Sequence, residues 1–176
     1  MCHCHTTSTN SMLIELIEPS KIRQSHLVNL RRSDNNDDPA LAQLERSLKS
    51  IGQIQPIICR VTGYRKEHQV DEIIECISGL RRLRIAQEQK LPRIKAIIYG
   101  FQQLSDVDTI ELFIADNPHL SQKEKNEMIL RLFRLLEDEK KQKPLNSNST
   151  DNTKLLRMRI ERIAQIYQVE LMQPTT

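Results

Sequence analysis

The feature that most constrains the fold is the way glycine and proline divide residues 39–98 into short segments of differing periodicity. Pro39 suits the first turn of a helix, because that position needs no backbone N–H, and Gly52 suits a left-handed helix end. Between them, apolar residues recur at helical spacing and predict one buried stripe. The stripe consists of Leu41, Leu44, Leu48 and Ile51.

Strand-like segments and a second helix follow. Apolar runs over residues 55–61 and 72–77 flank a polar turn, which predicts a β-hairpin. Residues 80–91 have the pattern of a short basic helix, and residues 94–98 alternate as a third core strand. An earlier apolar run over residues 13–17 predicts a further short strand. This mixture predicts an α+β fold with a small mixed sheet, followed by C-terminal helices.

The rest of the chain is predicted to be helices, loops and tails. Ser105 and Ser121 each precede an acidic residue three positions later, which is the capping-box pattern that opens a helix. The polar residues 18–38 are expected to form a surface loop. We expect a disordered tail over 1–12, a core over 13–117, a helical extension over 118–141, a hinge over 142–153 and a C-terminal helix over 154–176.

Composition excludes several classes of protein. The net charge of +3 is too small to imply a partner by itself. No apolar run reaches about 18 residues, so we expect no membrane-spanning helix. The four cysteines are too few for a disulfide framework, and a reducing cytoplasm is the expected location. The Cys and His residues within the first five positions lack a second pair of ligands, so we interpret them as a tail without a zinc site.

The turn at Ser78-Gly79 carries the strongest chemical signal. A strand ends there, and the following helix has three arginines in its first turn and a half. A helix N-terminus attracts anions, so cations are unfavourable there unless an anion lies between them. We therefore favour an anion site over a solvated cationic helix face. Its residues are Gly79, Arg81, Arg82 and Arg84.

Two other elements have the chemistry to complete such a site. The corner from Gly52 to Ile57, with Pro56 at a strand entrance, either faces a ligand or is a plain helix-to-strand connection. Asp116 and Asn117 either supply oxygen ligands to Mg²⁺ or cap a helix end. The pattern alone leaves both choices open.

The order of these motifs resembles the N-terminal domain of ParB-type chromosome and plasmid partition proteins. The similarity covers about residues 13–136 and rests on the combination of the Gln-Pro-Ile corner with the Gly-Leu-Arg-Arg-Leu-Arg turn. It also includes the Asp-Asn pair and the capped helix that begins near Ser121. The resemblance implies the ParB N-terminal or sulfiredoxin-like form of the α+β fold.

The resemblance also implies a ligand. Proteins of that family bind CTP with Mg²⁺, hydrolyse it slowly and close a clamp around DNA. By resemblance, Asp116 would bind the metal, whereas Leu80 departs from the glutamate that the family usually has there. The loop after Asn117 is also shorter than in the family. The nucleotide-binding residues would be Gly52, Gln55, Pro56, Gly79, Arg81, Arg82, Arg84 and Asn117.

The family resemblance implies DNA, a ParA-type ATPase and a second copy of the chain as partners. Residues 160–169 resemble the first helix and turn of a helix-turn-helix, and from the residues after them we expect no recognition helix. The last helix is basic, which suits either non-specific phosphate contacts or a solvated face. The residues proposed for DNA contact are Lys154, Arg157, Arg159 and Arg162.

Three other functions on the same scaffold are alternatives to this interpretation. A small phosphotransferase or nuclease would need a general base or metal cluster, and the sequence offers Asp116 and little else. A sulfiredoxin would need a nucleophilic cysteine in the glycine turn, whereas Cys76 lies inside the preceding strand, where a thiol is inert. An adaptor that kept the fold and lost the ligand is the third alternative.

Overall fold

The computed structural model describes residues 13–28, 39–65, 71–142 and 148–168. The chain divides into two compact units. Of the described residues, the first unit holds 13–23, 39–65 and 71–101 and is called the sheet unit here. The second holds 24–28, 102–142 and 148–168 and is called the helical unit. The unit boundary near residue 101 precedes the core limit of 117 that the sequence suggested, so the helix over 106–116 belongs with the later helices.

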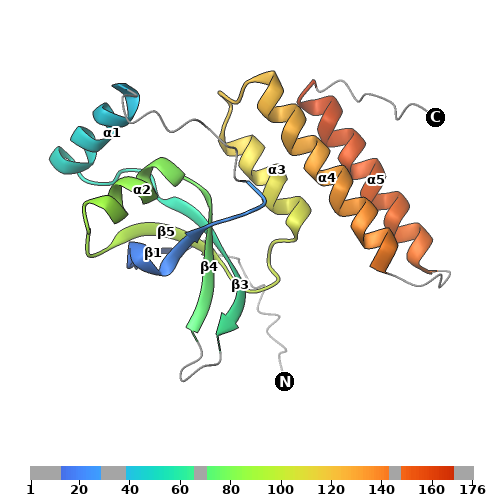
Figure 1. The fold of residues 1–176 in the computed structure, drawn as a ribbon, viewed down its shortest axis with the longest axis horizontal. Coiled ribbons are helices and arrows are strands. Elements are labelled where there is room, and N and C mark those ends of the chain that lie inside the picture. The colour runs from blue at the N-terminus through green and yellow to red at the C-terminus, as the bar shows by residue number, and fades with distance from the viewer. Residues whose placement is uncertain (1–12, 29–38, 66–70, 143–147, 169–176) are drawn as a thin grey trace, which may run out of the picture. The chain divides into compact units, whose positions relative to one another are not determined.

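The sheet has five strands in the order β1-β5-β3-β4-β2 (Figure 1). The central strand β3 pairs antiparallel with β4 and parallel with β5, and β1 pairs antiparallel with β5. The sheet is therefore mixed, as predicted. Its strands are β1 (Ile14–Ile17), β2 (Ile22–Gln24), β3 (Ile57–Arg65), β4 (Asp71–Ser78) and β5 (Ile94–Tyr99).

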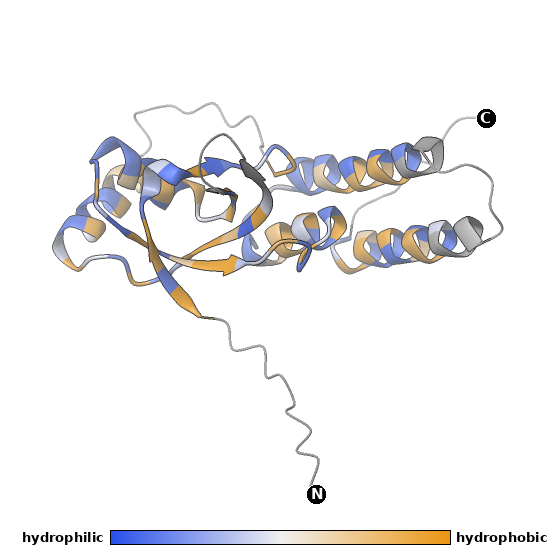
Figure 2. Ribbon diagram, turned by 90° about the horizontal axis from the view of Figure 1, so that it is seen from below, coloured by the Kyte–Doolittle hydropathy of each residue, from blue (hydrophilic) through white to orange (hydrophobic). Residues whose placement is uncertain are grey.

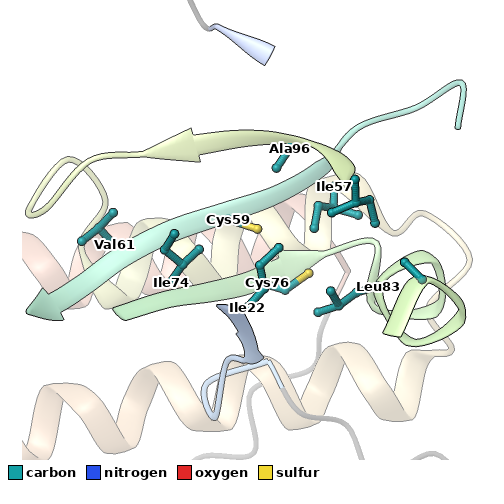
Figure 3. Packing of buried hydrophobic residues seen from close by; sticks show 10 residues of the cluster. Ile22, Ile57, Cys59, Val61, Ile74, Cys76, Leu83 and Ala96 are labelled. Carbon is teal, nitrogen blue, oxygen red and sulfur yellow. The ribbon is translucent and has the colours of Figure 1, made fainter. Parts of the chain in front are cut away.

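The core of the sheet unit lies between the sheet and helix α2 (Leu80–Glu88). Apolar side chains of β3, β4 and β5 alternate toward this side and meet the apolar face of α2 (Figure 3). The helix ends at Glu88, three residues before the limit predicted from the sequence. The buried cluster consists of Ile22, Ile57, Cys59, Val61, Ile74, Cys76, Leu83, Ala86, Ile94 and Ala96.

The prediction of an uninterrupted loop over residues 18–38 is wrong for its first part. A short 3-10 helix, η1 (Pro19–Lys21), leads into β2, and Ile22 is buried in the core. The Gln87 side chain donates to the carbonyl oxygens of Pro19 at 2.9 Å and Ile22 at 3.0 Å. These long-range contacts order a polar segment that has little strand propensity of its own. Residues 29–38 lie outside the described part of the chain.

Helix α1 (Pro39–Ser50) forms where predicted, but its apolar stripe is not buried. Leu41, Leu44 and Leu48 are only half-buried, and Ile51 is 71% exposed. Within the sheet unit α1 contacts α2, and Gln89 Nε2 donates to Glu45 Oε1 at 2.8 Å between them. A short helix that packs against another helix along one side leaves much of its apolar face in water.

The helical unit contains α3 (Asp106–Asp116), α4 (Gln122–Gln142) and α5 (Asn148–Ile166). Both predicted capping boxes are present. Ser105 Oγ accepts from the Asp108 N–H at 3.1 Å, while the Asp108 carboxylate accepts from the Ser105 N–H at 2.9 Å. The Glu124 carboxylate likewise accepts from the Ser121 N–H at 2.8 Å. These reciprocal bonds satisfy N–H groups that the first helical turn leaves unpaired.

Helices α4 and α5 pack side by side and run antiparallel (Figure 1). Hydrophobic residues recur along both helices with hydrophilic residues between them (Figure 2), and Ile160, Ile163 and Ala164 of α5 are fully buried. Gln122 Nε2 at the start of α4 donates to the Gln168 carbonyl just beyond α5 at 2.9 Å. No helix in the described ranges is long and apolar enough to span a membrane.

The prediction of a hinge or loop over residues 142–153 is wrong for residue 142 and for residues 148–153, which are helical. Helix α4 reaches Gln142, and α5 already begins at Asn148. Asn, Ser and Thr have modest helix propensity, which the packing of α5 against α4 overrides. Residues 143–147 lie outside the described part of the chain.

Candidate functional site

The corner between α1 and β3 is held by the side chains of Gln53 and Lys95, each of which forms hydrogen bonds with backbone atoms. Gly52 ends α1 with a φ of +83°, in the left-handed region predicted for it. The Gln53 side-chain amide then donates to the Lys95 carbonyl at 2.8 Å and accepts from the Lys95 N–H at 2.5 Å. Lys95 Nζ returns a bond to the Gln53 carbonyl at 3.0 Å. One side chain thus pairs with β5 much as another strand residue would.

Arg82 joins this corner to the start of α2. Its Nη1 atom donates to the Gln55 carbonyl at 2.8 Å and to the Pro56 carbonyl at 3.1 Å. The structure therefore brings the corner and the first turn of α2 together. The Gln55 and Pro56 carbonyl oxygens of this corner, which the sequence left open as a ligand-facing element, already accept hydrogen bonds from Arg82.

Gly79 precedes α2 as its N-cap, with a φ of +89°. A Cβ at this position would lie 2.7 Å from Ile57 Cγ2 and 3.1 Å from Arg82 Nη2. Both the backbone angle and the lack of space therefore require glycine. Around Gly52, by contrast, a Cβ would have no atom within 4 Å.

The three arginines of α2 do not form a single cradle. Arg81 is exposed, while Arg82 is half-buried against the corner. Arg84 is held along the helix by Glu88, with Nε and Oε1 2.8 Å apart. Arg82 projects about 100° around the helix from Arg81, whereas Arg81 and Arg84 are three residues apart and lie on neighbouring parts of the helix surface.

Asp116 and Asn117 lie at the C-terminal end of α3, in the helical unit. Asp116 is exposed, and Asn117 Nδ2 donates to the Phe113 carbonyl at 2.8 Å. Asn117 thereby caps the helix, which was one of the two interpretations left open. Among the described residues there is no group of three His, Cys, Asp or Glu side chains placed to hold a metal ion. A metal here would depend on Asp116 together with oxygens of its ligand.

The basic side chains of α5 are partly neutralised. Arg159 Nη2 lies 2.6 Å from both Asp108 Oδ1 and Glu111 Oε2 of α3, and these bonds raise the pKa of Arg159. Burial tends to raise the pKa of Asp108, but the hydrogen bonds from Ser105 and Arg159 outweigh burial and lower it. Arg157 pairs with Glu161 at 2.9 Å, whereas Lys154 and Arg162 are exposed.

Sequence reasoning missed a buried charge network on β3 and β4. Glu75 is 2% exposed and directly opposes Arg60 in the strand register, with Oε2 3.5 Å from Arg60 Nη2. Arg23 approaches the other carboxylate oxygen at 2.8 Å. The alternation of charged and apolar residues in the hairpin was the available signal, but the sequence did not show that this side of it is buried.

Cys59 and Cys76 face each other in the register of β3 and β4, and both are free thiols. The hydrogen bond with Cys76 and burial together raise the pKa of Cys59. Such a thiol stays protonated and unreactive at neutral pH, as predicted for core cysteines. The cysteines and histidines of residues 1–5 lie outside the described part of the chain.

Part of this chain is similar to solved protein structures. A C-terminally truncated chromosome-partitioning protein ParB from Caulobacter crescentus, complexed with CTP-gamma-S, is 20% identical with a TM-score of 0.48, over 71% of this chain and 65% of that one. A Pnob8-like ParB-N domain is 17% identical with a TM-score of 0.53, over 87% of this chain and 62% of that one. This chain thus spans slightly less than two thirds of either protein.

A sulfiredoxin from Arabidopsis thaliana is 27% identical with a TM-score of 0.37, over 50% of this chain and 85% of that one. No curated protein matches the sequence. The model of the ParB N-terminal domain family matches residues 4–117, which include the corner, the glycine turn and the Asp-Asn pair. With that match over more than half of its length, the chain belongs to the ParB N-terminal domain family.

Proposed function

We propose that this ParB-family chain binds CTP with Mg²⁺ and acts on DNA in plasmid or chromosome partition or in DNA regulation. The observation that supports the nucleotide site is the junction of the corner with the first turn of α2. This junction lies within residues 4–117, and it combines a positive helix N-terminus with arginine side chains. Both features favour a polyphosphate.

The proposed pocket assigns different chemistry to each part. Arg81 and Arg84 supply guanidinium groups for phosphate oxygens, and Gly79 allows close approach of the backbone. By the family resemblance, Asp116 is proposed as the carboxylate that would bind Mg²⁺, and the metal would neutralise phosphate charge. Within the sheet unit, Gly52, Gln55 and Pro56 are proposed to line the nucleotide site, and Arg82 shapes it. A nucleotide contact by Asn117 stays a prediction from the family resemblance.

Calorimetric titration with CTP, ATP and ADP, each with and without Mg²⁺, tests the nucleotide site. We expect CTP to bind more tightly with Mg²⁺, and Arg81→Ala to weaken binding about tenfold or more, because a charged hydrogen bond contributes roughly 1.5–3 kcal/mol. Arg157→Ala, an exposed arginine of the helical unit, is the matched control. Absence of binding at millimolar nucleotide would refute the nucleotide proposal. Release of inorganic phosphate from CTP would measure the slow hydrolysis that the family resemblance implies.

For DNA, the exposed Lys154 and Arg162 are the proposed phosphate contacts, with weaker contributions from Arg157 and Arg159 because carboxylates already engage them. Fluorescence anisotropy with a duplex of arbitrary sequence should show binding that weakens steeply with salt. The double variant Lys154→Ala/Arg162→Ala should reduce that salt dependence. Light scattering with CTP tests a homodimer, and co-sedimentation with a ParA-type ATPase tests that partner.

A further inference from the structure

We infer that Arg82 is a positioning residue that fixes the 53–57 corner against α2, rather than a phosphate ligand. One guanidinium nitrogen donates to two consecutive carbonyl oxygens, those of Gln55 and Pro56, at 2.8 and 3.1 Å. A single nitrogen has two N–H groups, one for each acceptor. The arginine therefore fixes the direction of the two successive peptide groups to which these carbonyl oxygens belong. This role exists without any ligand.

The packing around the guanidinium supports the assignment. Arg82 is half-buried, and its Nη2 atom lies where it would be only 3.1 Å from a Cβ on residue 79. Gly79 therefore leaves room for the guanidinium as well as for Ile57. A side chain confined in this way by a glycine turn loses little further freedom in holding the corner.

A second brace comes from the opposite side of the corner. Gln53 Nε2 donates to the Gln55 carbonyl at 2.9 Å as well as to the Lys95 carbonyl at 2.8 Å. The Gln55 oxygen thus accepts from both Gln53 and Arg82, which uses its two lone pairs. The corner is consequently held by β5 through Gln53 and by α2 through Arg82.

The inference changes how the proposed site would recognise an anion, and this consequence rests on the proposed nucleotide function. Phosphate contact would come mainly from the exposed Arg81 and from Arg84, which would exchange its bond to Glu88 for the ligand. Arg82 would contribute by keeping the corner in place before the ligand arrives. Its removal would then weaken binding through lost preorganisation.

Hydrogen exchange of the ligand-free protein tests the inference directly. Arg82→Ala should accelerate exchange of the Lys95 amide, whose N–H donates to Gln53 Oε1 in the corner, about tenfold or more, since two charge-assisted bonds to the corner are lost. Arg84→Ala, a neighbouring arginine on the same helix that bonds to Glu88, should leave the exchange of the Lys95 amide unchanged. Arg82→Lys keeps the charge without the planar fork and should restore the slow exchange only in part.

Nucleotide titrations at several salt concentrations separate positioning from contact. Arg81→Ala should reduce the salt dependence of CTP affinity, because it removes a charge that faces the phosphates. Arg82→Ala should weaken affinity while leaving the salt dependence as in the wild type. Unchanged exchange of the Lys95 amide in Arg82→Ala, or a loss of salt dependence equal to that of Arg81→Ala, would overturn the inference. If the wild type binds no CTP, the proposed function fails, while the exchange experiment still decides the role of Arg82.

Discussion

Replacing Gly79 by alanine should destabilise the sheet unit far more than the same change at Gly52. Both glycines have positive φ, +89° and +83°, so each substitution places an alanine in a left-handed conformation at a cost of about 1–2 kcal/mol. At position 79 the new Cβ would also lie 2.7 Å from Ile57 Cγ2 and 3.2 Å from Ile57 Cβ. Forcing a methyl group into such a space costs about 1–3 kcal/mol more.

We therefore expect a loss of about 2–5 kcal/mol for Gly79→Ala and about 1–2 kcal/mol for Gly52→Ala, where a Cβ would meet open space. The entropy that alanine removes from the unfolded chain is the same in both variants and cancels in their difference. Urea unfolding followed by circular dichroism gives the two free energies of unfolding. Exchange of the β3 amides confirms that the loss lies in the sheet unit.

A double-variant cycle isolates the steric part of this loss. Ile57→Ala removes the methyl group that the alanine at position 79 would strike, so Gly79→Ala should cost less in that background. Equal destabilisation by Gly79→Ala and Gly52→Ala, or no coupling between positions 79 and 57, would refute the reasoning. The backbone angle alone would then explain the glycine.

Three further outcomes follow from charge and burial. Glu75→Ala should cost about 3–5 kcal/mol in urea unfolding, because it leaves a buried arginine without its carboxylate, and a loss below about 1 kcal/mol would contradict this account. The folded-state pKa of Asp108 is lowered, so its contribution to stability is present above its unfolded pKa of about 3.9 and is lost as the pH falls through the folded pKa. Unfolding measured as a function of pH should show this acid loss, and Arg159→Ala should diminish it. In a variant without the two N-terminal cysteines, Cys59 and Cys76 should react with a thiol reagent only as fast as the sheet unit opens, and rapid labelling of the native protein would contradict their burial.

Local signals accounted for most features that could be predicted from the sequence. The capping boxes at Ser105 and Ser121 and the left-handed glycine at position 52 depend on residues close in the chain, and all three are present. The hairpin over β3 and β4 was likewise readable from its apolar runs. The hydrogen bonds of these elements join residues that are close in the chain, so a short stretch of sequence is enough to predict them.

Features that depend on distant residues could not be read in this way. The pairing of Gln53 with Lys95 spans 42 positions, and that of Arg82 with Gln55 spans 27. The arginines of α2 suggested a shared anion cradle because their charges are close in sequence, but Arg82 bonds to backbone and Arg84 to Glu88. A residue's charge is visible in the sequence, whereas the direction of its side chain depends on the tertiary fold.

The mixed pairing of the central strand has a consequence for the order of folding. Strand β3 meets β4 across a short connection, but it meets β5 only after the chain has passed through α2. Closing a long loop costs more entropy than closing a short one. We therefore expect the antiparallel pair of β3 and β4 to form first and the parallel pair of β3 and β5 to form later. Pulse-labelling during refolding should protect the amides between β3 and β4 earlier than those between β3 and β5, and simultaneous protection would contradict this order.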